Sequence, residues 1–245
     1  MLHAMGEIVI RAYRPEDRPA VRDICFDTGL MGESIAPQYA DRESFADMFT
    51  AHFTDNEPEH VVVADLDGRV VGYMCAALDA RTARSPMSYG IAHAFLRGVC
   101  FRPGTAGFYW RTGFDMFSDL VRAKKPKLDL NRFPSTNHIN LLPEARGGGA
   151  AFDLFFTAVD GLKERGSPGM HAEALASNKA VAEFITRKLG GEKLGEPYML
   201  PGLRGKDGER VQAQMFILDL TNYQPGEWKK AKAARAAKAK AKSAE

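Results

Sequence analysis

The stretch from His138 to Leu154, HINLLPEARGGGAAFDL, decides the fold of this chain. It opens with a short apolar run that has the length of a β-strand, and Pro143 ends the strand pairing because it has no N–H group. Three glycines, Gly147, Gly148 and Gly149, then precede a good helix-forming sequence from Ala150 to Glu164. A strand, a glycine turn and a helix direct several unpaired backbone N–H groups, and the positive end of the helix dipole, at one point. The sequence therefore predicts a cradle for a phosphate group.

The spacing of the glycines excludes two familiar phosphate-binding loops. A dinucleotide-binding G-x-G-x-x-G would place its third glycine at Phe152, and a P-loop would continue with Gly-Lys-Ser/Thr, which is absent here. The pattern Arg146-x-x-Gly149-x-Ala151 resembles instead the Q/R-x-x-G-x-G/A motif with which GNAT acetyltransferases hold the pyrophosphate of coenzyme A. The lead-in from Leu141 to Glu144, LLPE, is similar to that family as well. The alternative interpretation is a glycine-rich turn before an ordinary surface helix.

The chain on either side extends this resemblance. Gly169 to Leu175 is typical of a short strand, and an apolar-periodic helix follows Asn178 and runs to Gly190. This order resembles strand 5 and the next helix of GNAT proteins, in which an asparagine at the position of Asn178 holds the pantetheine arm. Asn178 is also a good N-cap for the helix, and the two roles are compatible. Residues 8–17 resemble the first strand and helix of the family.

The resemblance implies an α/β acyl-CoA N-acyltransferase fold. We expect a central, mixed, twisted sheet of about seven strands with helices on both faces, whose fourth and fifth strands are parallel and splay at one end. Residues 1–225 are expected to form one GNAT-like domain, and residues 226–245 a basic Ala/Lys-rich tail that is a frayed helix or disordered. The pair Asp67-Gly68 predicts a hairpin turn between two strands.

Residues 80–134 exceed what a minimal GNAT domain places before strand 4. They are rich in aromatic residues, and we expect a two-helix insertion with helices within Ile91–Val99 and Tyr109–Ala123. Most of these aromatics should be core and a few should line the pocket of the acceptor, so that the insertion narrows the cleft. The alternatives are an extension of the core and a dimer face. The insertion and the N-L-L-P-E-x-R stretch also resemble, more loosely, the acetyltransferase-like domain of O-GlcNAc-removing glycosidases.

Composition is that of an ordinary soluble globule, with 245 residues, 45% hydrophobic and 26% charged. The three cysteines are widely spaced and form no C-x-x-C pair, so no zinc site, no other metal and no disulfide framework is expected, and a cytoplasmic setting suits them. The N-terminus has no signal-peptide pattern, and no apolar run reaches the length needed to span a membrane, so no membrane partner is expected.

The net charge of +2 arises from the end of the chain. Residues 229–245 carry seven basic residues and one acidic residue, so the rest has 26 basic and 30 acidic residues and a net charge near −4. A nucleic-acid-binding body is therefore not expected, which leaves only weak, nonspecific contact with RNA through the tail. The expected partners are acetyl-CoA and an amine acceptor, with a homodimer as a further possibility.

The resemblance also implies how acetyl transfer is catalysed. The backbone N–H of Leu141 would polarise the thioester carbonyl, a task that needs no particular side chain. Leu142 would pair with pantetheine, and Arg146, Gly147, Gly148, Gly149, Ala150 and Ala151 would hold the pyrophosphate, with Asn178 on the pantetheine arm. The implied activity is that of an N-acetyltransferase that uses acetyl-CoA and direct attack by an amine.

A general base is expected because an amine must lose a proton near neutral pH. His138 is the first candidate, since an unperturbed imidazole pKa near 6.5 suits the task, and His171 and Glu173 on the next strand are second candidates. The alternative for His138 is a half-exposed residue at a strand end. The family's usual acid, a tyrosine in the helix after Asn178, is missing, because its position falls on Ile185 or Thr186; Tyr198 is the substitute candidate. The absent tyrosine motivates a second hypothesis, a catalytically inactive acetyl-CoA-binding or interaction module.

Overall fold

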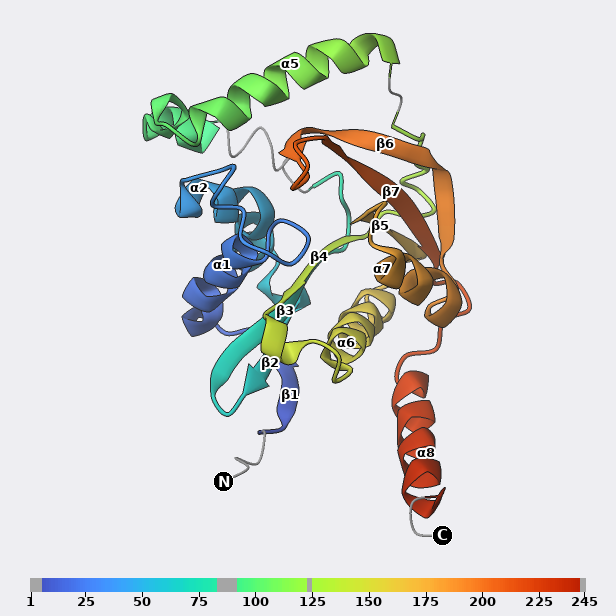
Figure 1. Cartoon of the computed structure of the whole chain (residues 1–245). Coiled ribbons are helices and arrows are strands. Elements are labelled where there is room, and N and C mark those ends of the chain that lie inside the picture. The colour runs from blue at the N-terminus through green and yellow to red at the C-terminus, as the bar shows by residue number, and fades with distance from the viewer. Residues whose placement is uncertain (1–5, 83–91, 123–124, 243–245) are drawn as a thin grey trace.

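The computed structural model describes residues 6–82, 92–122 and 125–242 (Figure 1). Its strands are β1 (Ile8–Ala12), β2 (Val61–Leu66), β3 (Arg69–Ala77), β4 (Thr136–Leu141), β5 (Gly169–Leu175), β6 (Glu192–Arg204) and β7 (Arg210–Asp219). Its α-helices are α1 (Arg18–Asp27), α2 (Arg42–Ala46), α3 (His52–Asn56), α5 (Ala106–Arg122), α6 (Ala150–Glu164), α7 (Lys179–Glu183) and α8 (Glu227–Lys242). Short 3₁₀ or π turns occupy Pro15–Asp17, Asp47–Ala51, Pro58–His60, Val99–Phe101, Pro143–Ala145 and Phe184–Lys188.

The described strands form two antiparallel sheets, in the orders β1-β2-β3-β4 and β5-β7-β6. The sheets meet at one parallel bridge between Ser135 and Met170, where the amide of His171 donates to the carbonyl of Ser135 at 2.8 Å. Beyond this bridge β4 and β5 diverge. The single parallel bridge agrees with the expectation of parallel, splayed fourth and fifth strands, but the expectation of one mixed sheet of about seven strands is wrong, because β4 and β5 lie in separate antiparallel sheets. The reason is that β4 stays paired with β3 along its whole length but keeps only the bridge on its other edge.

Helices cover both faces of the first sheet, as predicted (Figure 1). Strand β3 is buried on both sides, and its alternate residues enter different cores. Tyr73 and Cys75 pack with α1 and the helical stretch 42–56, while Met74 and Ala76 pack with α6. The loop before α6 is thus fixed against the sheet by a buried helix face.

The insertion differs from expectation in how its aromatics are placed. Residues 92–96 are helical and α5 matches the second expected helix, while residues 83–91 lie outside the described part of the chain. Phe108 is buried and Tyr109 partly so, but Phe95, Phe101, Trp110, Phe114 and Phe117 are exposed. The prediction that most insertion aromatics are core is therefore wrong. The face that α5 turns to the protein carries Thr112 and Asp115 instead.

The start of the tail is docked. Asp160 on α6 is buried and accepts hydrogen bonds from the hydroxyl of Tyr223 at 2.7 Å and the indole N–H of Trp228 at 2.9 Å. Trp228 also stacks on Phe156 with ring centroids 5.6 Å apart. Helix α8 therefore leaves the body from a fixed base beside α6. Among the described residues no helix is both long and apolar enough to cross a bilayer.

Candidate functional site

The glycine loop leaves the N-terminus of α6 open. Gly147 and Gly149 have φ angles of +82° and +91°, which favour glycine, and Gly149 is the N-cap of α6. No side chain caps the helix, and no atom lies within 4 Å of where a Cβ would stand on any of the three glycines. The amides of Ala150 and Ala151 in the first turn are therefore available to an anion, together with the positive end of the helix dipole.

The end of β4 presents a backbone amide to the gap between the sheets. The N–H of Leu142 donates to the carbonyl of Val71 on β3 at 2.9 Å. Neighbouring residues of a strand point their N–H groups to opposite edges, so the amide of Leu141 points away from β3. That edge is where β4 and β5 have diverged, so the amide of Leu141 has no neighbouring strand to pair with there.

The side chain of Arg146 turns back toward the protein. Its Nη2 donates to the carbonyl oxygens of Leu141 at 2.7 Å and Gly32 at 2.8 Å, and its Nε donates to Leu141 at 3.0 Å. The guanidinium therefore ties the glycine loop to the end of β4 and to the loop after α1. This arrangement orders the backbone of the cradle and does not aim the charge of Arg146 into it.

Asn178 caps the helix that follows β5. Its side-chain oxygen accepts from the amide of Val181 at 3.2 Å, which confirms the capping role anticipated from the sequence. The helix continues as α7 and the π turn Phe184–Lys188. Ile185 is buried and the hydroxyl of Thr186 donates to the carbonyl of Ala182 at 2.8 Å, so neither supplies an acid.

His138 lies on β4 between two aromatic side chains. Its ring stacks on Phe49 with centroids 5.3 Å apart, and its Nδ1 is 3.1 Å from the hydroxyl of Tyr73. Burial lowers the pKa of His138 to about 4. The expectation of an unperturbed pKa near 6.5 is therefore wrong, because the surrounding side chains desolvate the ring. His138 is neutral at pH 7, and it can accept a proton at Nε2 only in the tautomer that carries hydrogen on Nδ1 and donates it to Tyr73.

The second candidates lie on the other side of the gap. His171 is buried, its Nδ1 is 2.8 Å from the carbonyl of Phe133, and burial lowers its pKa. Glu173 stands three residues past the bridge, level with His138, and pairs with Lys125 at 2.5 Å. Tyr198 on β6 is buried, and burial, helped by Glu173, raises the pKa of its hydroxyl. The structure thus keeps the candidates apart: His138 packs against Phe49 and Tyr73, whereas Glu173 lies near Tyr198 on the strands of the second sheet.

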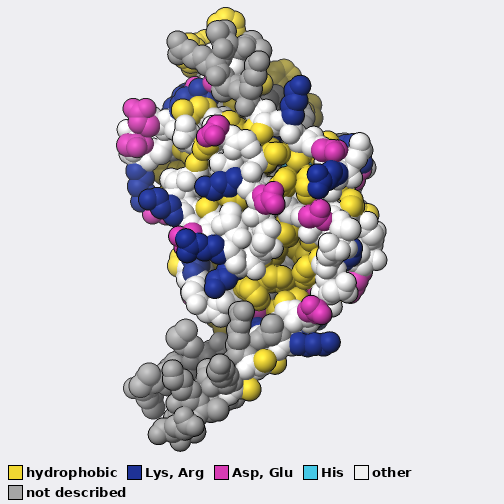
Figure 2. Space-filling model, turned by 90° about the vertical axis from the view of Figure 1, so that its right-hand side faces the viewer, with side chains coloured by type: hydrophobic (Ala, Val, Ile, Leu, Met, Phe, Trp, Pro, Cys, Tyr) yellow, Lys and Arg dark blue, Asp and Glu magenta, His cyan; other side chains and the backbone are white. Residues whose placement is uncertain are grey.

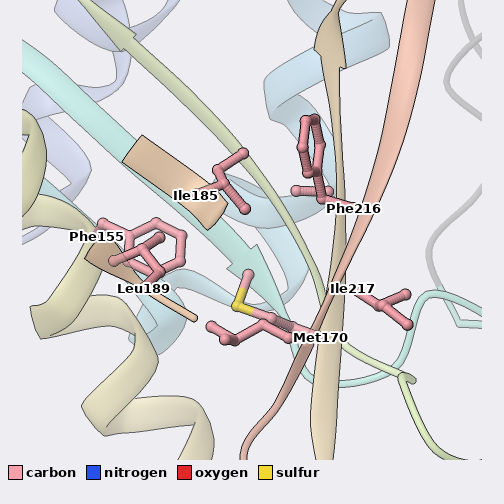
Figure 3. A pocket seen from close by; sticks show the side chains of 8 residues that line it. Phe155, Met170, Ile185, Leu189, Phe216 and Ile217 are labelled. Atoms are coloured by element: carbon pink, nitrogen blue, oxygen red, sulfur yellow. The ribbon is translucent and has the colours of Figure 1, made fainter. Parts of the chain in front are cut away.

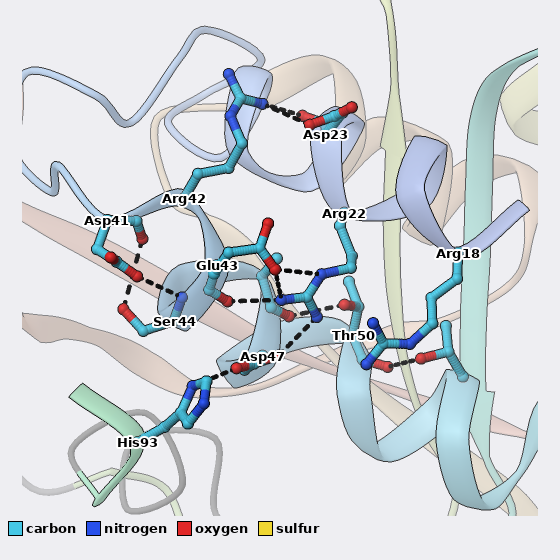
Figure 4. Close-up of polar contacts among 12 residues, drawn as sticks. Arg18, Arg22, Asp23, Asp41, Arg42, Glu43, Ser44, Asp47, Thr50 and His93 are labelled. Carbon is cyan, nitrogen blue, oxygen red and sulfur yellow. Dashed lines mark hydrogen bonds and ion pairs between the residues drawn. The ribbon is translucent and has the colours of Figure 1, made fainter. Parts of the chain in front are cut away.

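An ion-pair network around the buried Arg22 and Asp47 positions the helical stretch that carries Phe49 (Figure 4). Arg22 on α1 is bonded to Asp47 at 2.6 Å and to Glu43 at 2.5 Å, and His93 from the insertion also contacts Asp47. The paired residues are 21, 25 and 46 positions apart along the chain, so no local motif signals them. The network fixes the aromatic wall against which His138 stacks.

A small apolar pocket lies between α6, β5, the π turn and β7 (Figure 3). Phe155, Met170 and Ile185 are among the residues that line it, and its wall has almost no polar surface. On the face shown in Figure 2 hydrophobic side chains gather in the lower half, above α8, while acidic and basic side chains are interspersed higher up. Without a convergent polar group this pocket has no means to orient an acceptor, and we interpret it as a packing gap. The described residues include no group of three or more His, Cys, Asp or Glu arranged to hold a metal ion.

Solved structures resemble this arrangement over most of the chain. SsHAT matches with a TM-score of 0.56 and 23% identity, covering 85% of this chain and 97% of that one. A ribosomal-protein-alanine N-acetyltransferase from Brucella melitensis matches with a TM-score of 0.52 and 20% identity, covering 86% and 99%. The yncA protein from Salmonella typhimurium, in a structure with its cofactor acetyl-CoA, matches with a TM-score of 0.54 and 17% identity, covering 88% and 95%.

No protein-family model matches the chain. The narrower resemblance to the domain of O-GlcNAc-removing glycosidases is not confirmed by these structures. What the likenesses show is that this chain has the acyl-CoA N-acyltransferase fold of the GNAT proteins.

Proposed function

We propose that this protein is an N-acetyltransferase that moves the acetyl group of acetyl-CoA to an amine by direct attack. The observation that carries the proposal is the placement of two open backbone features at one gap. The amide of Leu141 faces the space between the diverging strands, and the uncapped N-terminus of α6 follows it within ten residues. One structure that shares this fold holds acetyl-CoA.

The residues that would hold the cofactor fall into three groups: those at the pyrophosphate, those at the pantetheine arm and one that orders the loop. The amides of Gly147, Gly148, Gly149, Ala150 and Ala151 would surround the pyrophosphate, which needs close backbone approach and positive potential. Leu142 would pair with the pantetheine arm through its backbone. The carboxamide nitrogen of Asn178 would donate to the same arm while its oxygen caps the helix. Arg146 would act by holding the loop in place, because its guanidinium is bound to protein carbonyls.

Acetyl-CoA supplies an activated acyl group, and the protein's part is to polarise the carbonyl and manage a proton. The N–H of Leu141 would donate to the carbonyl oxygen as negative charge develops there. His138 would take the proton from the attacking nitrogen through Nε2. With a pKa of about 4 it is a weak base, so transfer fits best after the C–N bond forms, when the nitrogen has become more acidic. The leaving thiolate would be protonated by water, with the hydroxyl of Tyr198 as the second candidate.

A catalytically inactive acetyl-CoA-binding module is the second candidate. It is favoured by the buried Ile185 and the back-bonded Thr186 at the usual position of the tyrosine. The low pKa of His138 points the same way. Both candidates share the cradle and differ only in turnover. For either we propose a cytoplasmic setting, in which the free Cys25, Cys75 and Cys100 stay reduced.

Turnover separates the two candidates. The protein would be incubated with acetyl-CoA and a panel of amines that includes diamines, polyamines and peptides with a free N-terminus, and the released thiol would be measured. Amine-dependent thiol release that falls by about 10²–10⁴-fold in His138→Ala supports the enzyme. Measurable acetyl-CoA binding without release above the buffer rate for any amine would leave the inactive module.

A further inference from the structure

Helix α5 and the segment just before it expose five large aromatic side chains, three of them on one stripe of α5. Within the insertion Phe95 is 65% exposed, Phe101 76%, Trp110 81%, Phe114 68% and Phe117 75%. A fully exposed aromatic side chain offers about 150–250 Å², so these five together offer on the order of 600–800 Å². A monomer rarely leaves a patch of that size uncovered, whereas a standard interface buries about 800 Å² on each partner.

The orientation of α5 is fixed by the charges on its other face. Asp115 accepts from both terminal nitrogens of Arg204 on β6 at 2.7 and 2.9 Å. One turn further on, Asp119 accepts from Arg210 on β7 at 2.7 and 2.5 Å. The helix therefore turns its ionised side to the protein and its aromatic side to solvent, the reverse of an ordinary surface helix. Rotating the aromatics inward would break both of these ion pairs.

The exposed face is built to receive another helix. Gly113 lies between Trp110 and Phe117 along one stripe, and no atom lies within 4 Å of where its Cβ would stand. A glycine inside a helix is destabilising relative to alanine, and nothing in the described chain requires one here. Its effect is a notch between two large rings, which lets a second backbone approach closely. The exposed positions of α5 from Gly107 to Phe117 carry no charge.

We infer that this α5 face pairs with the same face of a second copy of the chain. In a two-fold arrangement the ring of Trp110 from one copy would enter the notch at Gly113 of the other, and the reverse. The segment 80–127 is basic, with nine basic and two acidic residues, so two copies would bring net positive charge close together. The pairing should therefore hold or tighten when salt screens that repulsion. Figure 1 shows α5 at the top of the molecule and α6, whose N-terminus forms the cradle, below the sheets, so the pairing leaves the cradle free.

Sedimentation equilibrium of the full chain tests this inference. The expected result is a dimer whose dissociation constant stays equal or falls between 50 and 500 mM NaCl. Trp110→Lys should raise that constant by about 30-fold or more, as loss of a hot-spot aromatic does. Gly113→Leu, which is a better helix former, should raise it by about tenfold because it fills the notch. Val9→Lys on β1 is the matched control, since it adds the same charge at another exposed apolar residue, and it should change nothing.

Several outcomes would overturn the inference. A monomer at tens of micromolar, or a dimer that survives Trp110→Lys, would show that this face is not the contact. A salt-sensitive association of the monomer with anionic lipid vesicles, lost in Trp110→Lys, would assign the face to a membrane surface instead. Circular dichroism and acetyl-CoA binding of each variant confirm that the fold and the cradle are intact.

Discussion

His138 should make the stability of the protein depend on pH in a way that one substitution removes. The folded pKa is about 4 and the unfolded pKa is about 6.5, a difference of about 2.5 units. Between these values the unfolded chain binds a proton that the folded chain excludes, so stability is fully present above pH 6.5 and is lost as pH falls toward 4. At 1.36 kcal/mol per unit, the loss from this group between pH 7 and pH 4.5 is about 2 kcal/mol.

The assay is urea unfolding of wild type and His138→Phe at several pH values from 7 to 4.5, with ΔG taken by linear extrapolation. Phenylalanine keeps an aromatic ring against Phe49 but cannot titrate. Burial also lowers the pKa of His60 and of His171. The free energy of unfolding of the wild type should therefore fall between pH 7 and pH 4.5 by more than the part that His138 contributes. The difference in slope between the two proteins isolates His138. Equal slopes would refute a desolvated imidazole, and with it the role of a weak base proposed for His138.

Two further predictions concern the surroundings of the site. Tyr73→Phe removes the hydroxyl that holds Nδ1 of His138, so kcat should fall about tenfold, the order expected for one lost hydrogen bond, while the KM for acetyl-CoA stays constant. A steady-state measurement in which kcat is unchanged would remove Tyr73 from the mechanism. Lys232→Ala leaves the carboxylate of Asp153, one turn inside α6, without its ion-pair partner. Because the unpaired negative charge would repel the phosphates of acetyl-CoA, titration calorimetry should show an affinity lowered by about two- to tenfold. This loss of affinity should be smaller at high salt. Lys230→Ala, an exposed neighbour, is the control, and equal affinities for the two variants would contradict the argument.

Local signals in the sequence predicted the elements that build the cradle. Helix α6 begins at Ala150 and ends at Glu164, as expected from the glycines before it and the apolar periodicity within it. The hairpin at Asp67-Gly68 has positive φ at both residues, +52° and +85°, which is what that dipeptide favours. These features depend on neighbours along the chain and can therefore be read from it.

What escaped prediction depends on partners far away. The aromatic stripe of α5 has the periodicity of a buried face, but its charged side is bound by Arg204 and Arg210, some 90 residues later, and the stripe is left exposed. The separation of the two sheets follows from how few backbone hydrogen bonds join β4 to β5. The periodicity of hydrophobic residues along the sequence does not encode that number. The pKa of His138 depends on packing against Phe49, which lies in a separate helical stretch.

The central claim is that the N-terminus of α6 binds the pyrophosphate of acetyl-CoA, and the affinity of Gly149→Asp for acetyl-CoA tests it most directly. Gly166→Asp is the matched control, because Gly166 follows the other end of the same helix with a φ of +87° and equally open space around its Cβ position. Both variants carry the same strain and the same added charge. We predict that calorimetry will detect binding to wild type and to Gly166→Asp and none to a folded Gly149→Asp. Wild-type affinity in Gly149→Asp would contradict the account.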